Sequence, residues 1–441
     1  MNSLSTVFLL VVAYYLFRLP KAWAALPLLA GACYMTLGQE MVLGPFHFTV
    51  IRILVAVGGL RVASRKERIA GGWTPLDRIM VAWGIWGVFS SCFHKDFSSA
   101  LVSRLGMVYD GLGLYFLLRV FIEGIDGIVK VCKIVIILLI PIALEMGVEH
   151  FRGTNAFAVL GGIPEECEVR GGKIRAQGPF SHSILAGTVG AVCWPMALML
   201  WRENRKLALV GLAATGTIVL ASSSSGPIMT SAFVLLGFAL WRARRHMRLI
   251  RWGVVVVIIA LDIVMKAPVY YLISKVDLTG NSTGWHRSAL IGAAIEHFNE
   301  WWLGGTDYTR DWMPTGVQWS QDHTDITNHY IKMGVIGGFP LMLLFIGVLA
   351  SAFASIGKVL KRNTIAPFEL QFQIWTLGAI LFAHTVTFLS VAYFDQSVVF
   401  LYLVLAAIGS LSTEVVVKFP LQSDVLAPEA GVYGKNLSHN C

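Results

Sequence analysis

The feature that most constrains this chain is a succession of apolar segments, each about as long as a membrane is thick. A transmembrane helix needs about 20 mainly apolar residues. Hydrophobic residues make up 56% of the 441 residues and charged residues only 14%, whereas soluble domains carry about 25% charged residues. The pattern predicts an all-α polytopic membrane protein, because a membrane β-barrel would show short segments of alternating polarity instead.

We expect about 12–13 transmembrane helices in a single integral membrane domain that covers residues 1–441. The expected spans are residues 4–18, 23–42, 46–61, 76–93, 100–121, 127–147, 182–201, 206–222, 226–242, 252–273, 330–356, 369–392 and 396–416. Most connections between them are short. Two are long, at residues 148–181 and 274–329, and long connections are where binding and catalytic residues concentrate.

Basic residues predict the orientation of the bundle. Cytoplasmic loops of membrane proteins carry an excess of Lys and Arg, and the basic clusters of this chain all fall on one side of the expected spans. These clusters are Arg18 and Lys21; Arg61, Arg65, Lys66 and Arg68; Arg202, Arg205 and Lys206; Arg242, Arg244, Arg245, Arg248 and Arg251; and Lys358, Lys361 and Arg362. The N-terminus and both long loops would then lie outside and the C-terminus inside. The formal charge of +9 thus reflects topology, and we expect no nucleic-acid partner.

Two further sequence features bear on the membrane and on metals. The first apolar segment has no basic residue before it and "RLPK" after it, so we expect it to stay as a span and not to be cleaved as a signal peptide. The six cysteines form no CxxC pair. This argues against a cysteine zinc site and against a disulfide framework.

The first long loop ends in a basic, glycine-containing stretch, "VRGGKIRAQGPFSHSILAG". Arg170, Lys173 and Arg175 lead into Gly178, and a helix is expected to start near Ser181. An arginine beside a helix N-terminus suits an oxyanion such as phosphate. The alternative is a basic loop that lies at lipid headgroups, which we favour for Arg170 and Lys173. Arg175 stands at the turn itself and is the candidate anion ligand.

The second long loop combines a surface helix with a titratable cluster. Its helical pattern runs over residues 285–302, with Arg287 near the start, and is typical of a helix at the membrane surface. The cluster follows in "SQDHTDITNHYIKMGVIGG", where His323, Asp325 and His329 precede the next apolar run. A histidine can take a proton from a hydroxyl while a carboxylate orients the ring.

A metal site is the alternative interpretation of this cluster, because histidine and carboxylate are also metal ligands. His323 and His329 are six positions apart, which does not place them on one helical face, and no HExxH spacing occurs. One more cation belongs to the candidate site: Arg104, in "SRLGMVYDGLG", falls toward the outer end of an expected span. Snorkelling of Arg104 to the membrane surface is the competing explanation.

Three of these places resemble the bacterial O-antigen ligase and O-antigen polymerase (Wzy-like) superfamily. "KIRAQGPFSHSILAG" is similar to its arginine-containing segment before a helix, and "GWHRSALIGAAIEHFNEWWLGG" to its second arginine segment. "HTDITNHYIKMGVIGG" resembles its histidine–glycine element, in which ten residues separate the two. Ten residues separate His323 from Gly334, whereas the residue at the same spacing from His329 is Pro340. The resemblance therefore favours His323 over His329 as the catalytic histidine.

The resemblance implies a metal-independent glycosyltransferase of the GT-C type that works without a cofactor. It would lie in the bacterial inner membrane, with its active site facing the periplasm, and would use a glycan on undecaprenyl diphosphate as donor. Arg175, Arg287 and Arg104 would bind the diphosphate, while His323, with Asp325 and His329 nearby, would activate the acceptor hydroxyl. The acceptor could be a lipid A core, a second lipid-linked glycan or a protein hydroxyl, and membrane lipids would surround the bundle.

Two other function classes fit an apolar chain of this kind. A transporter or flippase of lipid-linked sugar would predict charged residues spread through the middle of the bilayer and an internal repeat, whereas the conspicuous charges here cluster in the two outside loops. A pore-forming or scaffold subunit would not need loops as polar as these.

Overall fold

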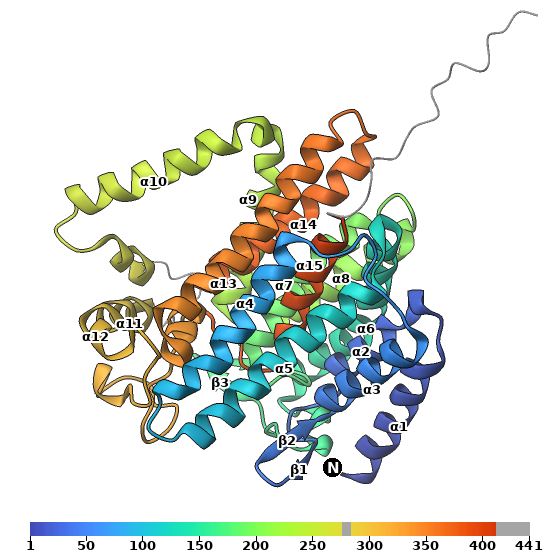
Figure 1. Cartoon of the computed structure of the whole chain (residues 1–441), viewed down its shortest axis with the longest axis horizontal. Coiled ribbons are helices and arrows are strands. Elements are labelled where there is room, and N and C mark those ends of the chain that lie inside the picture. The colour runs from blue at the N-terminus through green and yellow to red at the C-terminus, as the bar shows by residue number, and fades with distance from the viewer. Residues whose placement is uncertain (276–283, 412–441) are drawn as a thin grey trace, which may run out of the picture.

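The computed structural model describes residues 1–275 and 284–411, and this part of the chain is mostly helical (Figure 1). Its 15 α-helices are α1 (Ser3–Arg18), α2 (Ala25–Tyr34), α3 (Val50–Arg65), α4 (Pro75–Phe89), α5 (Phe97–Phe121), α6 (Gly124–Arg152), α7 (Ser183–Met199), α8 (Arg205–Ala221), α9 (Ser225–Ala239), α10 (Met247–Val264), α11 (Gly284–Glu296), α12 (Phe298–Trp301), α13 (His329–Arg362), α14 (Phe368–Thr387) and α15 (Val398–Leu411).

Short 3₁₀ helices and two β-hairpins join these helices. The 3₁₀ helices are η1 (Lys21–Trp23), η2 (Ser90–Phe93), η3 (Ala156–Leu160), η4 (Leu240–His246), η5 (Val269–Lys275) and η6 (Arg310–Trp312). One antiparallel hairpin pairs β1 (Glu40–Leu43) with β2 (Phe46–Thr49), and the other pairs β3 (Glu168–Arg170) with β4 (Lys173–Arg175).

Three helices, α5, α6 and α13, are long and apolar enough to cross a membrane, and a bent run from Ser225 to Lys275 counts as a fourth if it is taken as one span. The structure thus supports a helical membrane protein. Every expected span overlaps a helix, although α1, α7 and α15 are shorter apolar helices. The full set of about 12–13 crossings stays a prediction. The end of the last expected span, beyond residue 411, lies outside the described residues.

The structure differs from three expected spans, in two places. Within residues 23–61, the helix α2 ends at Tyr34, and residues 40–49 form the β1–β2 hairpin, which turns at Gly44 with φ +59°. The second difference is in residues 252–273, where α10 ends at Val264 and the chain then bends by 91° into η5. Pro268 precedes η5, and proline disfavours helix in the residue before it.

The bundle has two unlike ends. In Figure 1 the N-terminus and the β1–β2 hairpin lie at the bottom, α11 and α12 lie at the left beside the lower end of α13, and the turn between α9 and α10 lies at the top. The latter turn is formed by η4, whose last residues are Arg244, Arg245 and His246. Helix α15 is buried along its whole length, while α10 extends away from the bundle and buries none of its residues (Figure 1).

Helix α13 begins next to the candidate site and is interrupted by a break. The Asn328 side chain caps its first turn by accepting from the N–H groups of Tyr330 and Ile331. The break lies at Gly337 and Gly338, where Gly338 has φ +79°. A Cβ at Gly338 would lie 2.1 Å from the Leu303 carbonyl oxygen, so only glycine lets the second long loop approach the helix so closely.

Candidate functional site

Arg175 is held at the base of the β3–β4 hairpin. Only 3% of the residue is exposed. One terminal nitrogen donates to Glu168 at 2.5 Å and the other to the Ser224 hydroxyl at 2.8 Å, while its Nε is buried without a hydrogen-bond partner in the described part of the chain. Burial lowers the pKa of the guanidinium, and the Glu168 charge opposes this effect. Arg175 therefore keeps one buried donor for another group.

His182 lies beside Arg175 at the start of α7. Its Nδ1 accepts from the Ile184 N–H at 3.1 Å, so the neutral ring carries its proton on Nε2, which is 4.0 Å from a Glu168 oxygen. His182 was not among the residues predicted from the sequence, although a histidine between Gly-Pro and the start of an apolar helix could have indicated it.

Arg287 lies on α11, in the second long loop, and interacts electrostatically with Arg170 of the first long loop. Its Nε is also buried without a partner among the described residues. Burial lowers the pKa of Arg287 first and the Arg170 charge next, while Asp325 opposes both effects. The Arg170 charge also lowers the pKa of Arg175. Arg170 is thus an electrostatic neighbour of both arginines, and the two long loops contribute cations to one region.

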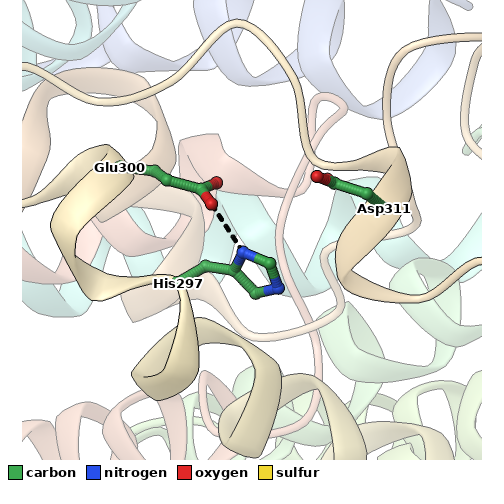
Figure 2. A group of neighbouring side chains, drawn as sticks. All are labelled: His297, Glu300 and Asp311. Carbon is green, nitrogen blue, oxygen red and sulfur yellow. Dashed lines mark hydrogen bonds and ion pairs between the residues drawn. The ribbon is translucent and has the colours of Figure 1, made fainter.

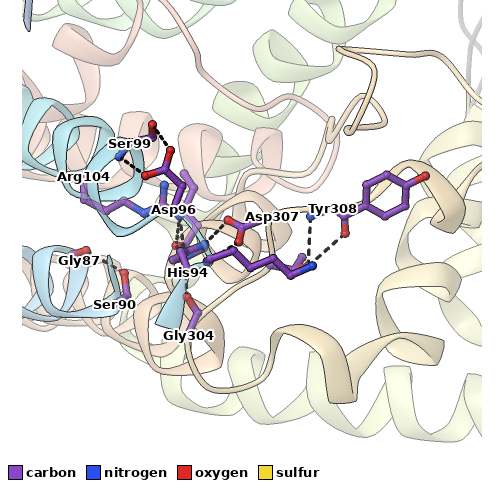
Figure 3. A network of polar contacts seen from close by, with 12 residues as sticks. Gly87, Ser90, His94, Asp96, Ser99, Arg104, Gly304, Asp307 and Tyr308 are labelled. Carbon is purple, nitrogen blue, oxygen red and sulfur yellow. Dashed lines mark hydrogen bonds and ion pairs between the residues drawn. The ribbon is translucent and has the colours of Figure 1, made fainter. Parts of the chain in front are cut away.

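Arg104 is fixed by a polar network at the N-terminal end of α5 (Figure 3). One terminal nitrogen lies 2.6 Å from the Ile336 carbonyl oxygen and 2.9 Å from His94 Nε2. The other ring nitrogen of His94 is 2.5 Å from Asp307, whose second oxygen accepts from the Lys95 N–H. Arg104 Nε has no hydrogen bond within the described residues. The break of α13 exposes the Ile336 carbonyl that orients this arginine.

A cavity of about 340 Å³ opens between α3, α5, α13 and the segment before α15. Its charged and titratable lining residues include Arg52, Arg104, Asp110, His329, Lys332 and Asp395. Lys332 donates to the Tyr393 carbonyl at 2.9 Å, and Arg52 forms an ion pair with Asp110 at 2.8 Å. Lys332 and Asp395 were not selected from the sequence. A lysine within an expected span was the available signal for Lys332, because such residues are costly in a bilayer.

Asp395 connects this cavity to the first long loop. Its carboxylate accepts from the N–H groups of Ser181 at 2.9 Å and Ser397 at 2.8 Å, and burial raises its pKa. The next residue, Gln396, donates to the Pro179 carbonyl at 2.7 Å. The turn that follows Arg175 therefore packs against one wall of the cavity.

His329 is part of the cavity wall, with 4% of the residue exposed. Its ring stacks on Phe388 at 4.6 Å between centroids, and its Nδ1 accepts from the Tyr393 N–H at 3.2 Å. The neutral ring therefore carries its proton on Nε2. In this state His329 can donate a hydrogen bond into the cavity but has no free nitrogen to accept a proton.

His323 lies on the turn that precedes α13 and is half-buried. Its Nδ1 is 3.1 Å from the Ser320 hydroxyl, and its carbonyl accepts from the N–H groups of Trp319 and Ser320. Its imidazole makes no contact with Arg175 or Arg287 among the interactions of the described residues. Trp319 contacts the cavity residue Phe394, with ring centroids 5.2 Å apart. The turn that carries His323 thus packs at the edge of the cavity.

Asp325 lies between the two groups of charges. Burial raises the pKa of its carboxyl, and the charges of His286, Lys332 and Arg287 oppose that effect. Asp325 is therefore an electrostatic neighbour of Arg287 in the loop and of Lys332 in the cavity. Of the residues predicted from the sequence, Arg104 and His329 line this cavity, whereas Arg175, Arg287, Asp325 and His323 are not among its lining residues. Charge effects relate Arg175 to Arg287 through Arg170, and Arg287 to Lys332 through Asp325.

Comparison with known proteins adds no assignment: no protein-family model matches the chain, and no curated protein matches it.

Proposed function

We propose that this protein transfers a glycan from undecaprenyl diphosphate to an acceptor hydroxyl at the periplasmic face of a bacterial inner membrane. The observation that carries the proposal is shared by Arg104, Arg175 and Arg287, each of which keeps a buried Nε–H without a partner in the described residues. A buried donor left unpaired costs about 1–3 kcal/mol. An oxyanion bound through Nε and a terminal nitrogen would remove this cost and supply a bidentate contact.

The chemistry of the donor explains why several guanidinium groups are needed. When the bond between the sugar C1 and the diphosphate oxygen breaks, its electron pair leaves with the diphosphate, and negative charge develops there. Preorganised cations in a partly dry site stabilise such charge strongly. Arginine suits this role, because its fork matches phosphate oxygens and its charge persists on burial. The proposed reaction accordingly uses no metal ion on the diphosphate and no cofactor.

His323 is the proposed base. It takes the proton of the acceptor hydroxyl while that oxygen forms the new bond to C1. His323 is half-buried and, within the described chain, has one side-chain hydrogen bond, to Ser320, so a ring nitrogen remains for the acceptor. The single usable tautomer of His329 makes it a donor to substrate oxygens rather than a base. Asp325 interacts electrostatically with both Arg287 and Lys332. Its proposed role is to hold these two cations in place.

The helical bundle fits this chemistry as a GT-C-type membrane glycosyltransferase. The polyprenyl chain of the donor would stay among membrane lipids, while its diphosphate reaches the charged end of the bundle. The lipid A core, a second lipid-linked glycan and a protein hydroxyl all remain acceptors of the proposed reaction.

A transporter or flippase of lipid-linked sugar is the second candidate. The cavity favours it, because Arg52, Arg104 and Lys332 come from three helices and all line the space between them. Such a protein would move the lipid-linked glycan between leaflets and leave its chemical bonds intact.

The test is incubation of the purified protein in lipid nanodiscs with undecaprenyl-diphosphate glycan and each acceptor class. We expect undecaprenyl diphosphate to be released in step with glycosylated acceptor, as measured by mass spectrometry. Movement of intact lipid-linked glycan across vesicle membranes, with no acceptor product, would support the transporter and overturn the transferase.

A further inference from the structure

Three possible metal ligands converge on the surface of the second long loop, away from the cavity. They are His297 and Glu300 at α12 and Asp311 in η6 (Figure 2). One ligand atom from each side chain lies within 4.8 Å of the other two. Ligands around one tetrahedral or octahedral ion with bond lengths of about 2.0–2.2 Å are separated by similar distances. We infer that these three side chains form a binding site for a divalent transition-metal ion such as zinc.

Contacts within the cluster and with Trp312 orient the side chains. Residues three apart lie on one face of a helix, and His297 Nδ1 is 2.6 Å from one oxygen of Glu300. The other Glu300 oxygen accepts from the Trp312 indole N–H at 3.1 Å. The Trp312 ring also stacks on the His297 ring, with 5.7 Å between centroids and 17° between planes. Such outer contacts are typical of metal sites, where they fix ring orientation and tautomer.

Glu300 pairs with His297, but the Asp311 carboxylate is not balanced by a protein group in the described chain. Asp311 has no hydrogen bond or ion pair with any residue that the structure describes, and its carboxylate points toward Glu300 and His297 in Figure 2. The adjacent Arg310 does not neutralise it, because that guanidinium donates to the carbonyls of Met313, Pro314 and Gly316. Two carboxylates that face each other repel, and a bound cation would remove this repulsion.

The donor set indicates the class of ion. One imidazole nitrogen with two carboxylate oxygens suits zinc and related divalent transition metals, whereas calcium and magnesium prefer ligand sets made only of oxygen. Three protein ligands leave at least one position of a four-coordinate zinc ion for water. The ion would be exchangeable, because Glu300 and Asp311 are exposed.

A bound ion would connect α12 to the segment that carries His323. Asp311 lies two residues after Thr309, whose N–H donates to the Asp322 carbonyl at 2.9 Å and whose hydroxyl accepts from the Thr324 N–H at 3.2 Å. These two bonds flank His323. The ion therefore acts as a structural link that restrains the loop, and it takes no part in the transfer chemistry. The inference does not depend on the proposed function.

Zinc titration of the tag-free, chelator-treated full-length protein in detergent tests the site. We expect one saturable zinc equivalent by calorimetry, an absorption band from bound Co²⁺, and a higher unfolding temperature with zinc. Asp311→Asn, a substitution of an exposed residue, should weaken zinc binding at least about tenfold, as should His297→Ala. His47→Ala is the matched control, because His47 also pairs with a glutamate, Glu40, at 2.9 Å but belongs to no three-ligand group in the described chain.

Equal zinc affinity in the wild type, Asp311→Asn and His297→Ala would overturn the site, as would loss of affinity in His47→Ala. An Asp311→Asn protein that unfolds at the wild-type temperature without zinc shows that its fold is intact. Glycan transfer plays no part in these measurements, so their failure and the failure of the proposed function are distinguishable.

Discussion

The arginines of the candidate site differ from the other buried arginines in what their guanidinium groups contact. Arg61 is fully buried, and its Nε and both terminal nitrogens bond to Glu67 or to the Leu16 carbonyl. Arg119 Nε is buried without a hydrogen bond as well, but it faces the Asp77 carboxylate at 3.5 Å. The buried Nε of Arg104, Arg175 and Arg287 has neither a hydrogen bond nor a facing carboxylate within 4.0 Å in the described structure. These three arginines therefore keep a donor that a further anion could accept from.

Replacing Arg175 or Arg287 by lysine should lower glycan transfer about 100-fold, or about 2.7 kcal/mol of transition-state stabilisation. Lysine keeps the positive charge but lacks the fork that binds two phosphate oxygens. The rate of product release in nanodiscs measures the effect. Arg152→Lys is the control, because Arg152 is exposed at the end of α6. Wild-type rates in both lysine variants would show that the two arginines make only packing or headgroup contacts.

The two histidines of the second loop should fail in different ways. His323→Ala should abolish transfer at unchanged protein level and unfolding temperature, because its ring makes one side-chain hydrogen bond among the described residues. His329→Ala removes a buried ring that stacks on Phe388, so it should cost roughly 3 kcal/mol of stability. Unfolding temperature and initial rate, measured on the same preparations, separate the two effects. Retained activity in His323→Ala would show that another residue acts as the base.

The candidate site was only partly predictable from sequence. Arg175 was selected from its place in a basic turn before a helix, whereas Arg287, and His323 in preference to His329, were selected through the family resemblance. Lys332 and Asp395 line the cavity, yet they lie far apart in the sequence, and only the packing of α13 against the segment before α15 brings them together. The tautomer of His329 was also not predictable from the sequence, because it depends on a hydrogen bond from the Tyr393 N–H.

At the scale of elements, the break in α13 connects the second long loop to the bundle. The Phe339 N–H donates to the Trp302 carbonyl at 2.8 Å, and the Thr306 N–H donates to the Val335 carbonyl at 3.0 Å. These bonds use backbone groups that a continuous helix would occupy. Pro340, four residues after Ile336, has no N–H, so the Ile336 carbonyl is free to accept from Arg104. The shape of one helix thus places both a loop and a candidate ligand.

Gly338→Ala should therefore destabilise the protein by at least about 2 kcal/mol and lower transfer as well. Its φ of +79° disfavours any side chain, and the new Cβ would lie 2.1 Å from the Leu303 carbonyl oxygen. Gly357→Ala, in the same helix, meets no atom within 4 Å and should be neutral or stabilising by roughly 0.5–1 kcal/mol. Thermal unfolding in one detergent compares the two variants. Equal unfolding temperatures would show that the break adapts to a side chain.

Hydrophobicity located the helices but not every change of backbone direction. Residues 40–49 are apolar enough to extend two expected spans, yet they form two antiparallel strands that are joined by a turn at Gly44. A short apolar run does not distinguish strand from helix. The break in α13 was equally hidden, since "GGFP" inside an apolar run is compatible with a continuous span that is merely kinked.

At the scale of the whole molecule, charge separates the two ends of the bundle. In Figure 1, α11 and α12 lie at one end of the bundle and the turn between α9 and α10 lies at the other. Arg287 belongs to α11 and His297 precedes α12, while Arg244 and Arg245 belong to the turn between α9 and α10. An excess of basic residues marks the cytoplasmic side of a membrane protein. The donor diphosphate would then be bound on the opposite, outer side.

Cysteine labelling in intact cells tests this orientation. In a background without native cysteines, Gln321→Cys should react with a membrane-impermeant maleimide, because Gln321 is exposed on the turn that carries His323. Thr364→Cys, exposed in the α13–α14 connection, should react only after the cells are permeabilised. Both positions lie outside helices, so neither substitution disturbs the bundle. The reverse pattern would place the arginines in the cytoplasm, where the proposed periplasmic transfer could not occur. Labelling of both positions in intact cells would mean that residues 329–362 do not cross the membrane.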